Sequence, residues 1–217
     1  RVSPTTPIDT QGGAITITGY SGPGGDVTIP ETIDGLPVTK IGNSAFFHQY
    51  NLTGITIPNS VTTIGNSAFE YCTNLTHVTI PNSVANIEER AFFVCAGLTN
   101  VLIGSGVNHI GTNAFYYCHN LTAMTVDVLN PVFSSVAGVL YNQSQTTLFQ
   151  CPWGKAGSFS IPATVTAIGS YAFYFCTNVT SITLPNSVTN IADGAFFWCS
   201  GLTNITLGNS VSYLGNS

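Results

Sequence analysis

LTGITIPNSVTTIGNSAFEYCTN, residues 52–74, decides the fold because its pattern recurs along most of the chain. The pattern returns with the same length of 23 residues at 75–97, 98–120, 156–178 and 179–201. A slightly longer unit over 27–51 comes before these copies, and a partial one over 202–217 follows them. A fixed period in this range predicts a solenoid in which each copy forms one coil and stacks on the next.

Within one copy, the residue types indicate where the strand and the turns lie. The segment LTGITI alternates apolar and polar residues like a half-exposed strand, so Leu52, Ile55 and Ile57 are expected to face the core and Thr56 the solvent. Pro58 ends this strand, and the later segment NSAF resembles the capped start of a short helical turn. We therefore predict a right-handed repeat solenoid with one parallel β-sheet and short helical or 3-10 turns on the opposite arc.

The composition describes a globular chain with very few charges. Of its 217 residues, 44% are hydrophobic and 6% are charged, with a net charge of -5, whereas about 25% of residues are charged in an ordinary soluble domain. A disordered chain would instead be poor in apolar residues. The four basic residues are scattered, so the sequence predicts no nucleic-acid partner. It has no run of about 18 apolar residues, which predicts no membrane span.

Five of the six cysteines occupy one phase of the repeat. These are Cys72, Cys95, Cys118, Cys176 and Cys199. One cysteine per coil forms a column, and we interpret the column as buried, reduced side chains that pack as small apolar groups. Zinc would need about four ligands that converge on one point, which a column does not supply. Cys151 lies outside the predicted column and is expected to be the exposed cysteine.

Two columns of outward-facing residues are candidates for a contact surface. The first follows the core phenylalanine of each coil and consists of the pairs Phe47-His48, Glu70-Tyr71, Phe93-Val94, Tyr116-Tyr117, Tyr174-Phe175 and Phe197-Trp198. A short turn cannot bury both members of every pair, so some aromatic area must reach the surface, where it favours an interface. The alternative is packing between aromatic residues of adjacent coils. The residues proposed for contact are Tyr71, Tyr116, Tyr117, Tyr174, Phe175 and Trp198.

The second column is a row of threonines on the predicted sheet. It includes Thr28 and the alternative contact residues Thr56, Thr79, Thr125, Thr183 and Thr206, with Leu102 interrupting the row. Threonine is also common on exposed strands because of its β-propensity, and that explanation requires no partner. The four histidines fall at four different repeat phases, which argues against a metal site or a catalytic triad. The sequence therefore predicts no catalytic residue, no metal and no cofactor.

The pattern L-x-x-I-x-I-P-x-S-V-x-x-I-G-x-x-A-F-x-x-C-x-x resembles the leucine-rich repeats of the BspA-like bacterial surface-protein family. The resemblance extends over 27–217 and implies a leucine-rich-repeat solenoid of about eight coils. Residues 1–26 would then form an N-terminal cap of strand and turn. The irregular coil at 121–155 contains NPVFSSVAGVLYNQSQTTLFQCPWGK, which is similar to a hairpin insertion found in that family. The last coil is incomplete.

The same resemblance implies a function that involves no catalysis. Members of this family are associated with cell-surface and secreted proteins that adhere to or recognise other molecules. We therefore expect a non-enzymatic binding or adhesion module, outside the cell or at a bacterial surface, with a protein or glycan partner. The alternative is a structural subunit that associates with other copies of itself into a larger extracellular assembly. The chain begins at Arg1 without a visible signal peptide, so we expect a mature form or a fragment.

Overall fold

The computed structural model describes residues 6–216, which divide into two compact units. Unit 1 comprises the described residues up to 120 together with 127–131, and unit 2 comprises 121–126 and 132–216. Residues 1–5 of the expected N-terminal cap lie outside the described residues. Each unit is a β-solenoid, which confirms the predicted repeat architecture.

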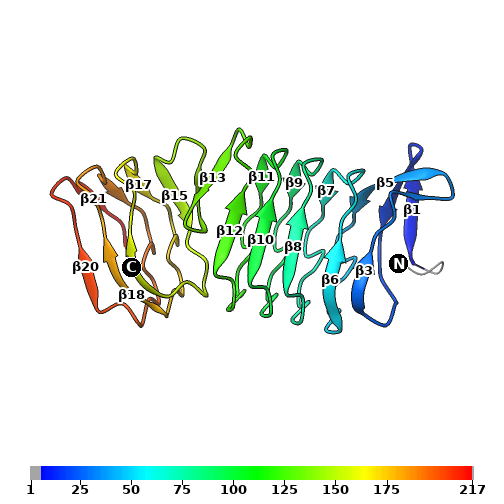
Figure 1. The fold of residues 1–217 in the computed structure, drawn as a ribbon, viewed down its shortest axis with the longest axis horizontal. Coiled ribbons are helices and arrows are strands. Elements are labelled where there is room, and N and C mark those ends of the chain that lie inside the picture. Colours follow the sequence, from blue (N-terminus) through cyan, green and yellow to red (C-terminus); the bar gives the residue numbers. More distant parts are fainter. Residues whose placement is uncertain (1–5, 217) are drawn as a thin grey trace. The chain divides into compact units, whose positions relative to one another are not determined.

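The long strands of unit 1 form the predicted parallel sheet, in which neighbouring strands are one repeat apart. Val78 lies opposite both Ile55 and Val101, and Thr28 lies opposite Thr56. Figure 1 shows β6, β8 and β10 side by side in the cyan and green part of the chain. The order of strands in this sheet is β10 (Asn100–Ile103), β8 (His77–Ile80), β6 (Leu52–Thr56) and β3 (Gly25–Thr28).

A second parallel ladder of unit 1 was not predicted. Its last three strands are two residues long, and Ile64 lies opposite Ile41 on one side and Ile87 on the other. The ladder continues from the antiparallel hairpin at the start of the chain, and β4 (Thr32–Ile33) pairs with β5 from outside it. Its order is β1 (Ile8–Gln11), β2 (Ala14–Ile17), β5 (Leu36–Ile41), β7 (Thr63–Ile64), β9 (Asn86–Ile87) and β11 (His109–Ile110).

The remaining side of each coil is an arc of turns, where the sequence analysis expected short helical or 3-10 turns. The N–H groups of Ser44, Phe46 and His48 donate to carbonyls of the next coil at 2.7–2.9 Å. The N–H groups of Ala45 and Phe47 between them donate to carbonyls three residues back in their own coil. A helix would need every N–H group to find its acceptor within the same segment. Because half of these groups bond to the neighbouring coil, the arc forms a ladder instead.

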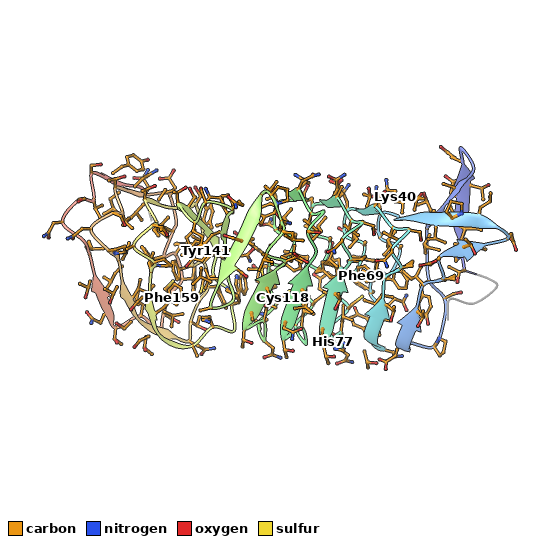
Figure 2. The ribbon with its side chains drawn as sticks, turned by 45° about the horizontal axis from the view of Figure 1, so that its top comes forward. Lys40, Phe69, His77, Cys118, Tyr141 and Phe159 are labelled. Carbon is orange, nitrogen blue, oxygen red and sulfur yellow. The ribbon has the colours of Figure 1, made fainter. Side chains whose placement is uncertain are left out.

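The core of unit 1 is organised around a column of aromatic rings. Phe46, Phe69, Phe92 and Phe115 are at most 1% exposed, and successive ring centroids lie 4.9–5.3 Å apart with interplanar angles of 16° or less. Figure 2 labels Phe69 together with Cys118, which is also buried in this unit. Tyr20 stacks on the first ring of the column, at 5.1 Å. Stacking at one ring per coil therefore fixes the coils in register.

Unit 2 begins with the irregular coil and confirms the predicted hairpin. Strand β12 (Ala123–Val126) lies beside β13 (Phe133–Val136) and β14 (Val139–Asn142), since the N–H of Met124 donates to Gly138 O at 2.9 Å. Strand β14 pairs antiparallel with β13 and with β15 (Thr147–Gln150).

Parallel ladders then resume in unit 2 with the regular coils. One ladder joins β15, β17 (Ala167–Ile168), β19 (Asn190–Ile191) and β21 (Tyr213–Leu214). The other joins β16 (Gly157–Ser160), β18 (Val179–Thr183) and β20 (Asn204–Thr206). The core between them includes Tyr141 and Phe159, which Figure 2 labels.

The stacked rings should dominate the stability of unit 1. We expect Phe92→Ala to lower the free energy of unfolding by about 3–5 kcal/mol, because it removes a fully buried ring and leaves a cavity. Thr79→Ala, on the exposed side of β8, should change it by less than about 0.5 kcal/mol. Urea unfolding followed by circular dichroism measures both variants. Equal losses in the two variants would show that the column does not carry the fold.

Candidate functional site

The cysteine column is part of the core. Cys72, Cys95 and Cys118 are 0% exposed, and each Sγ donates to the carbonyl of the core phenylalanine in the preceding coil at 3.1–3.2 Å. Cys199 makes the same contact with Phe173 O at 2.9 Å. Burial raises the pKa of Cys72 and Cys118 from 9.0 to about 12, so these thiols stay protonated. All six cysteines are free. The side chains therefore tie each coil to the one before it.

The expectation that Cys151 is exposed was wrong. Its side chain is 1% exposed in the core of unit 2. The Sγ atoms of Cys151 and Cys176 both approach Pro152 O, at 3.8 and 3.7 Å. The irregular coil thus brings Cys151 next to the following column cysteine, although their separation in sequence is 25 residues instead of 23. The two additional residues lie between Cys151 and the next copy at 156, in a turn where the N–H of Lys155 donates to Pro152 O at 3.0 Å.

The aromatic pairs of unit 1 form a continuous surface stripe. We define stripe 1 as Phe47, His48, Tyr71, Phe93 and Tyr117. Successive rings meet edge to face: the ring planes of Phe47 and Tyr71 are 86° apart, those of Tyr71 and Phe93 78°, and those of Phe93 and Tyr117 74°. Each of these side chains is half-buried or exposed. The rings therefore pack against one another from coil to coil, and part of their area reaches the surface.

The second member of each pair sits on a left-handed backbone. His48, Tyr71, Val94 and Tyr117 have φ values of 58–62°, in a region that bulky and β-branched residues rarely occupy. The ladder of the arc imposes this conformation, because it must turn every second N–H group toward the next coil. A left-handed residue costs roughly 1–2 kcal/mol. The fold therefore holds large rings at positions where asparagine or glycine would be less strained.

One ion pair interrupts the aromatic pattern of unit 1. Glu70 replaces the first aromatic residue of its pair, and its Oε1 accepts a hydrogen bond from Arg90 Nη2 at 2.6 Å. The Glu70 side chain is 5% exposed, whereas that of Arg90 is 41% exposed and lies 4.2 Å from the ring centroid of Phe93. This pair was not predicted from the sequence. The sequence does contain an indication of the pair, because Glu70 and Arg90 place opposite charges in two adjacent coils where the other coils have uncharged residues.

Unit 2 carries a second set of rings, stripe 2, which comprises Trp153, Tyr174, Phe175, Phe197 and Trp198. Trp153 lies 4.9 Å from Phe175 and is 3% exposed, so it covers that ring from the irregular coil. Tyr174 stacks with Phe197 at 6.0 Å and 11°, while Trp198 is 59% exposed. Stripe 2 thus mixes stacked pairs, such as Phe175 and Trp198 at 30°, with the edge-to-face pair of Trp153 and Tyr174 at 73°.

The other predicted contact residues are half-buried or exposed. Tyr116 is half-buried on the arc of unit 1. The sheet-face threonines Thr28, Thr56, Thr79, Thr125, Thr183 and Thr206 are all exposed, as is Leu102. A separate threonine row beside them is used structurally, since Thr76 Oγ1 donates to Thr53 O at 3.2 Å and Thr99 Oγ1 donates to Thr76 O at 3.0 Å. The aromatic and threonine candidates thus lie on different sides of the coils.

Residues with metal-binding or proton-transfer side chains are dispersed. Among residues 6–216, no group of three or more His, Cys, Asp and Glu side chains is arranged to hold a metal ion. His48 instead belongs to stripe 1, where its ring stacks on Phe47 at 4.0 Å and its Nδ1 lies 3.0 Å from the Tyr50 hydroxyl. Within the described part of the chain, none of the segments forms a helix with the length and apolarity to cross a membrane.

The repeat of this chain is similar to repeats in known proteins. Residues 27–137 and 143–217 match the profile of the BspA type leucine rich repeat region in six copies. The crystal structure of the pneumococcal vaccine antigen PcpA has a TM-score of 0.70 and 28% identity, over 82% of this chain and 45% of that one. The chain therefore spans less than half of that antigen's length. A search of curated proteins finds no match.

Two further solved structures cover nearly the whole chain. A leucine rich cell surface protein from Faecalibacterium prausnitzii A2-165 is 28% identical with a TM-score of 0.56, over 99% of this chain and 79% of that one. The T. pallidum leucine rich repeat protein is 28% identical with a TM-score of 0.60, over 99% of this chain and 86% of that one. The sequence profile and the structural likeness thus agree on the same repeat.

The buried thiols should be nearly inert in the native protein. At pH 8 we expect slow reaction with iodoacetamide, because the raised pKa values leave little thiolate and burial excludes the reagent. Cys199, the one half-buried thiol, should react first, and Cys151 should react only after denaturation. Mass spectrometry of the alkylated peptides over time measures the order. Early labelling of Cys151 would contradict its place in the core.

The ion pair beneath stripe 1 should contribute measurably to stability. We expect Glu70→Ala to lower the free energy of unfolding by about 1–2 kcal/mol, because it leaves the Arg90 guanidinium without its carboxylate. Glu70→Gln keeps an acceptor and should cost less. Glu89→Ala removes an exposed carboxylate nearby and serves as the matched control, with an effect below about 0.5 kcal/mol. Chemical unfolding compares the three variants, and equal effects at Glu70 and Glu89 would argue against the pair.

Proposed function

The chain belongs to the BspA type leucine rich repeat family, and we propose that it is a non-enzymatic binding or adhesion module of a bacterial surface or secreted protein. In this proposal it recognises a protein or glycan partner along its aromatic stripes. Repeat solenoids present extended surfaces and commonly act in molecular recognition. A location outside the cell is part of the proposal, supported by the F. prausnitzii relative, which is described as a cell surface protein.

The observation that carries the proposal is the exposure of large rings on a strained backbone. Trp198 is 59% exposed with a φ of 59°, although the residues inside each coil are almost fully buried. Tyrosine and tryptophan are the side chains that most often dominate the energy of an interface. Keeping them in left-handed conformations costs stability, and strain of this kind is typical of functional positions.

A rigid surface also favours binding. Within each stripe, the rings contact one another from coil to coil, so their side chains lose little freedom when a partner covers them. The threonine face, by contrast, presents small side chains with little apolar area to remove from water. The sheet face is therefore the alternative contact surface, and the stripes are the preferred one.

The second candidate function is self-association into an extracellular assembly. Burial of the same rings between two copies would remove them from water equally well, so the stripes support this candidate too. Light scattering coupled to gel filtration gives the mass in solution over a range of concentrations. A monomer at all concentrations would eliminate the assembly and leave the binding module.

We expect the double variant Tyr117→Ala, Phe175→Ala to lose binding while it stays folded. Wild type and variant are compared on an array of immobilised polysaccharides and extracellular matrix proteins, and unfolding midpoints are measured in parallel. Loss of one ring from each stripe should weaken the wild-type interactions at least about tenfold. The matched control is Thr79→Ala, Thr183→Ala, which alters the sheet face in both units and should keep binding. If the threonine variant loses binding and the aromatic variant keeps it, the contact surface is the sheet face.

A further inference from the structure

We infer that Cys151 and Cys176 form a disulfide bond when the protein folds under oxidising conditions. Both residues belong to unit 2, and both are at most 1% exposed. The inference concerns the core of that unit and is independent of the proposed contact surface. It rests on the backbone position of Cys151, on the hydrogen bonds of Cys176 and on the contact between the two side chains.

Cys151 occupies the position that a core phenylalanine has in the regular coils. Its N–H donates to Ala172 O at 2.7 Å, just as the N–H of Phe46 donates to Ala68 O at 2.7 Å. In both cases the acceptor comes directly before the core phenylalanine of the next coil. The irregular coil therefore has a thiol where the regular coils have a phenyl ring.

This replacement brings a second thiol next to a column cysteine. A column cysteine donates to the carbonyl of the core phenylalanine one coil earlier, as Cys199 does to Phe173 O at 2.9 Å. For Cys176 the equivalent carbonyl is that of Cys151, and it lies 3.7 Å from Cys176 Sγ. The two thiols thus come from adjacent coils and meet in the core of unit 2.

The sulfur atoms of this pair are close to each other and weakly held. Cys176 Sγ and Cys151 Sγ share Pro152 O as an acceptor, at 3.7 and 3.8 Å. The side chain of Cys176 also hydrogen-bonds that of Cys151, and this bond, together with burial, raises the pKa of Cys176. Contacts of this length restrain a side chain little, so rotation about the Cα–Cβ bonds can turn the two sulfur atoms toward each other.

The column cysteines are poorer partners for one another. The Sγ atoms of Cys72, Cys95 and Cys118 each donate to a phenylalanine carbonyl at 3.1–3.2 Å. A disulfide between two of them would break two such short bonds. Between Cys151 and Cys176 it would replace only long contacts, so the hydrogen bonds of the core favour this pair.

The surroundings of the pair determine when the bond can form. Tyr141, which Figure 2 labels, is 0% exposed, and burial and the nearby Cys151 thiolate raise its pKa. Trp153, two residues after Cys151, is 3% exposed. A thiolate is the species that attacks a disulfide, and an apolar environment disfavours it. The exchange therefore takes place while the irregular coil is still open, and folding then shields the bond.

The reaction is a thiol–disulfide exchange with a small disulfide such as oxidised glutathione. One protein thiolate attacks a glutathione sulfur and releases the first glutathione, and the second protein thiolate attacks the mixed disulfide and releases the other. Two S–H bonds of the protein are replaced by one S–S bond. The two electrons and two protons leave on the two glutathione thiols. Such oxidants prevail outside the cytosol.

The test refolds the full chain in the presence of the oxidant. Protein that is reduced and unfolded in urea is diluted into a mixture of oxidised and reduced glutathione, the folded product is isolated by gel filtration, and its free thiols are blocked with N-ethylmaleimide in urea. Trypsin cleaves after Lys155 and separates the two cysteines, and chymotrypsin cleaves between Cys176 and Cys199. We expect mass spectrometry to find Cys151 linked to Cys176 and the other four cysteines blocked.

The bond should also stabilise the protein. Closing the loop over 152–175 restricts the unfolded chain, so we expect oxidised protein to melt about 5–10 °C above reduced protein. Cys151→Ala should abolish both the linked peptide and this difference. The matched control is Cys199→Ala, which removes a thiol one coil away in the same unit and should keep both.

Two results would overturn the inference. One is a folded product in which all six cysteines carry the blocking group. The other is linkage of Cys151 or Cys176 to a different cysteine in the same or a higher yield. If Cys151→Ala does not fold, the linked peptides of the wild type and of Cys199→Ala decide the question, because neither measurement needs that variant.

Discussion

The hydrogen-bond ladder along the arc is the constraint on which the rest of this structure depends. Every second N–H group of the arc donates to a carbonyl of the next coil, as those of Phe69 and Tyr71 do at 2.7 and 2.9 Å. These hydrogen bonds form along the whole arc only if successive coils place equivalent residues opposite each other. This requirement keeps the repeat at 23 residues. It also aligns the core phenylalanines face to face. Coil length, ring stacking and the bonds from Cys72 and Cys95 to the preceding coil all follow from this alignment.

The same ladder explains why the surface of the arc is aromatic and strained. Turning alternate N–H groups toward the neighbour requires left-handed residues at two positions per coil, as at Ser67 and Tyr71. Asparagine or glycine would satisfy that backbone with less strain. Large rings at the second position therefore need another source of free energy. Contacts between neighbouring rings supply part of it, as between Tyr71 and Phe93 at 6.4 Å, and a bound partner would supply more.

The sequence predicted the features that depend on periodicity, because periodicity is visible in the residue order. The outward face of Thr56 and the burial of Cys95 both followed from the repeat phase. The alternating hydrogen bonds were not predictable, since no residue type marks whether an N–H group bonds within its coil or to the next one. The burial of Cys151 was also missed, because the two additional residues lie in the turn after Cys151 and leave its side chain in the core.

The candidate site shows a similar division. The aromatic column was visible in the sequence, whereas the ring angles that distinguish stripe 1 from stripe 2 depend on side-chain packing. Nor could composition show that Glu70 and Arg90 pair, because their separation of 20 residues is not a whole repeat. Departures of the chain from its own pattern were the available signal for that pair.

Departures from the repeat also separate structural roles from surface roles. Asn130 occupies the phase at which Val107 fills the core one coil earlier, and its burial would leave an amide without partners. Its Nδ2 instead donates to Gly104 O at 2.9 Å and to Val107 O at 2.8 Å, so the coil compensates internally for the polar side chain.

The departures on stripe 1 change what the surface presents, since Arg90 brings a half-exposed cation beside the Phe93 ring. A repeat protein can vary such positions with little effect on the ladder beneath them, because the backbone bonds of the arc involve no side chain. Recognition can therefore change from coil to coil on a scaffold that stays the same.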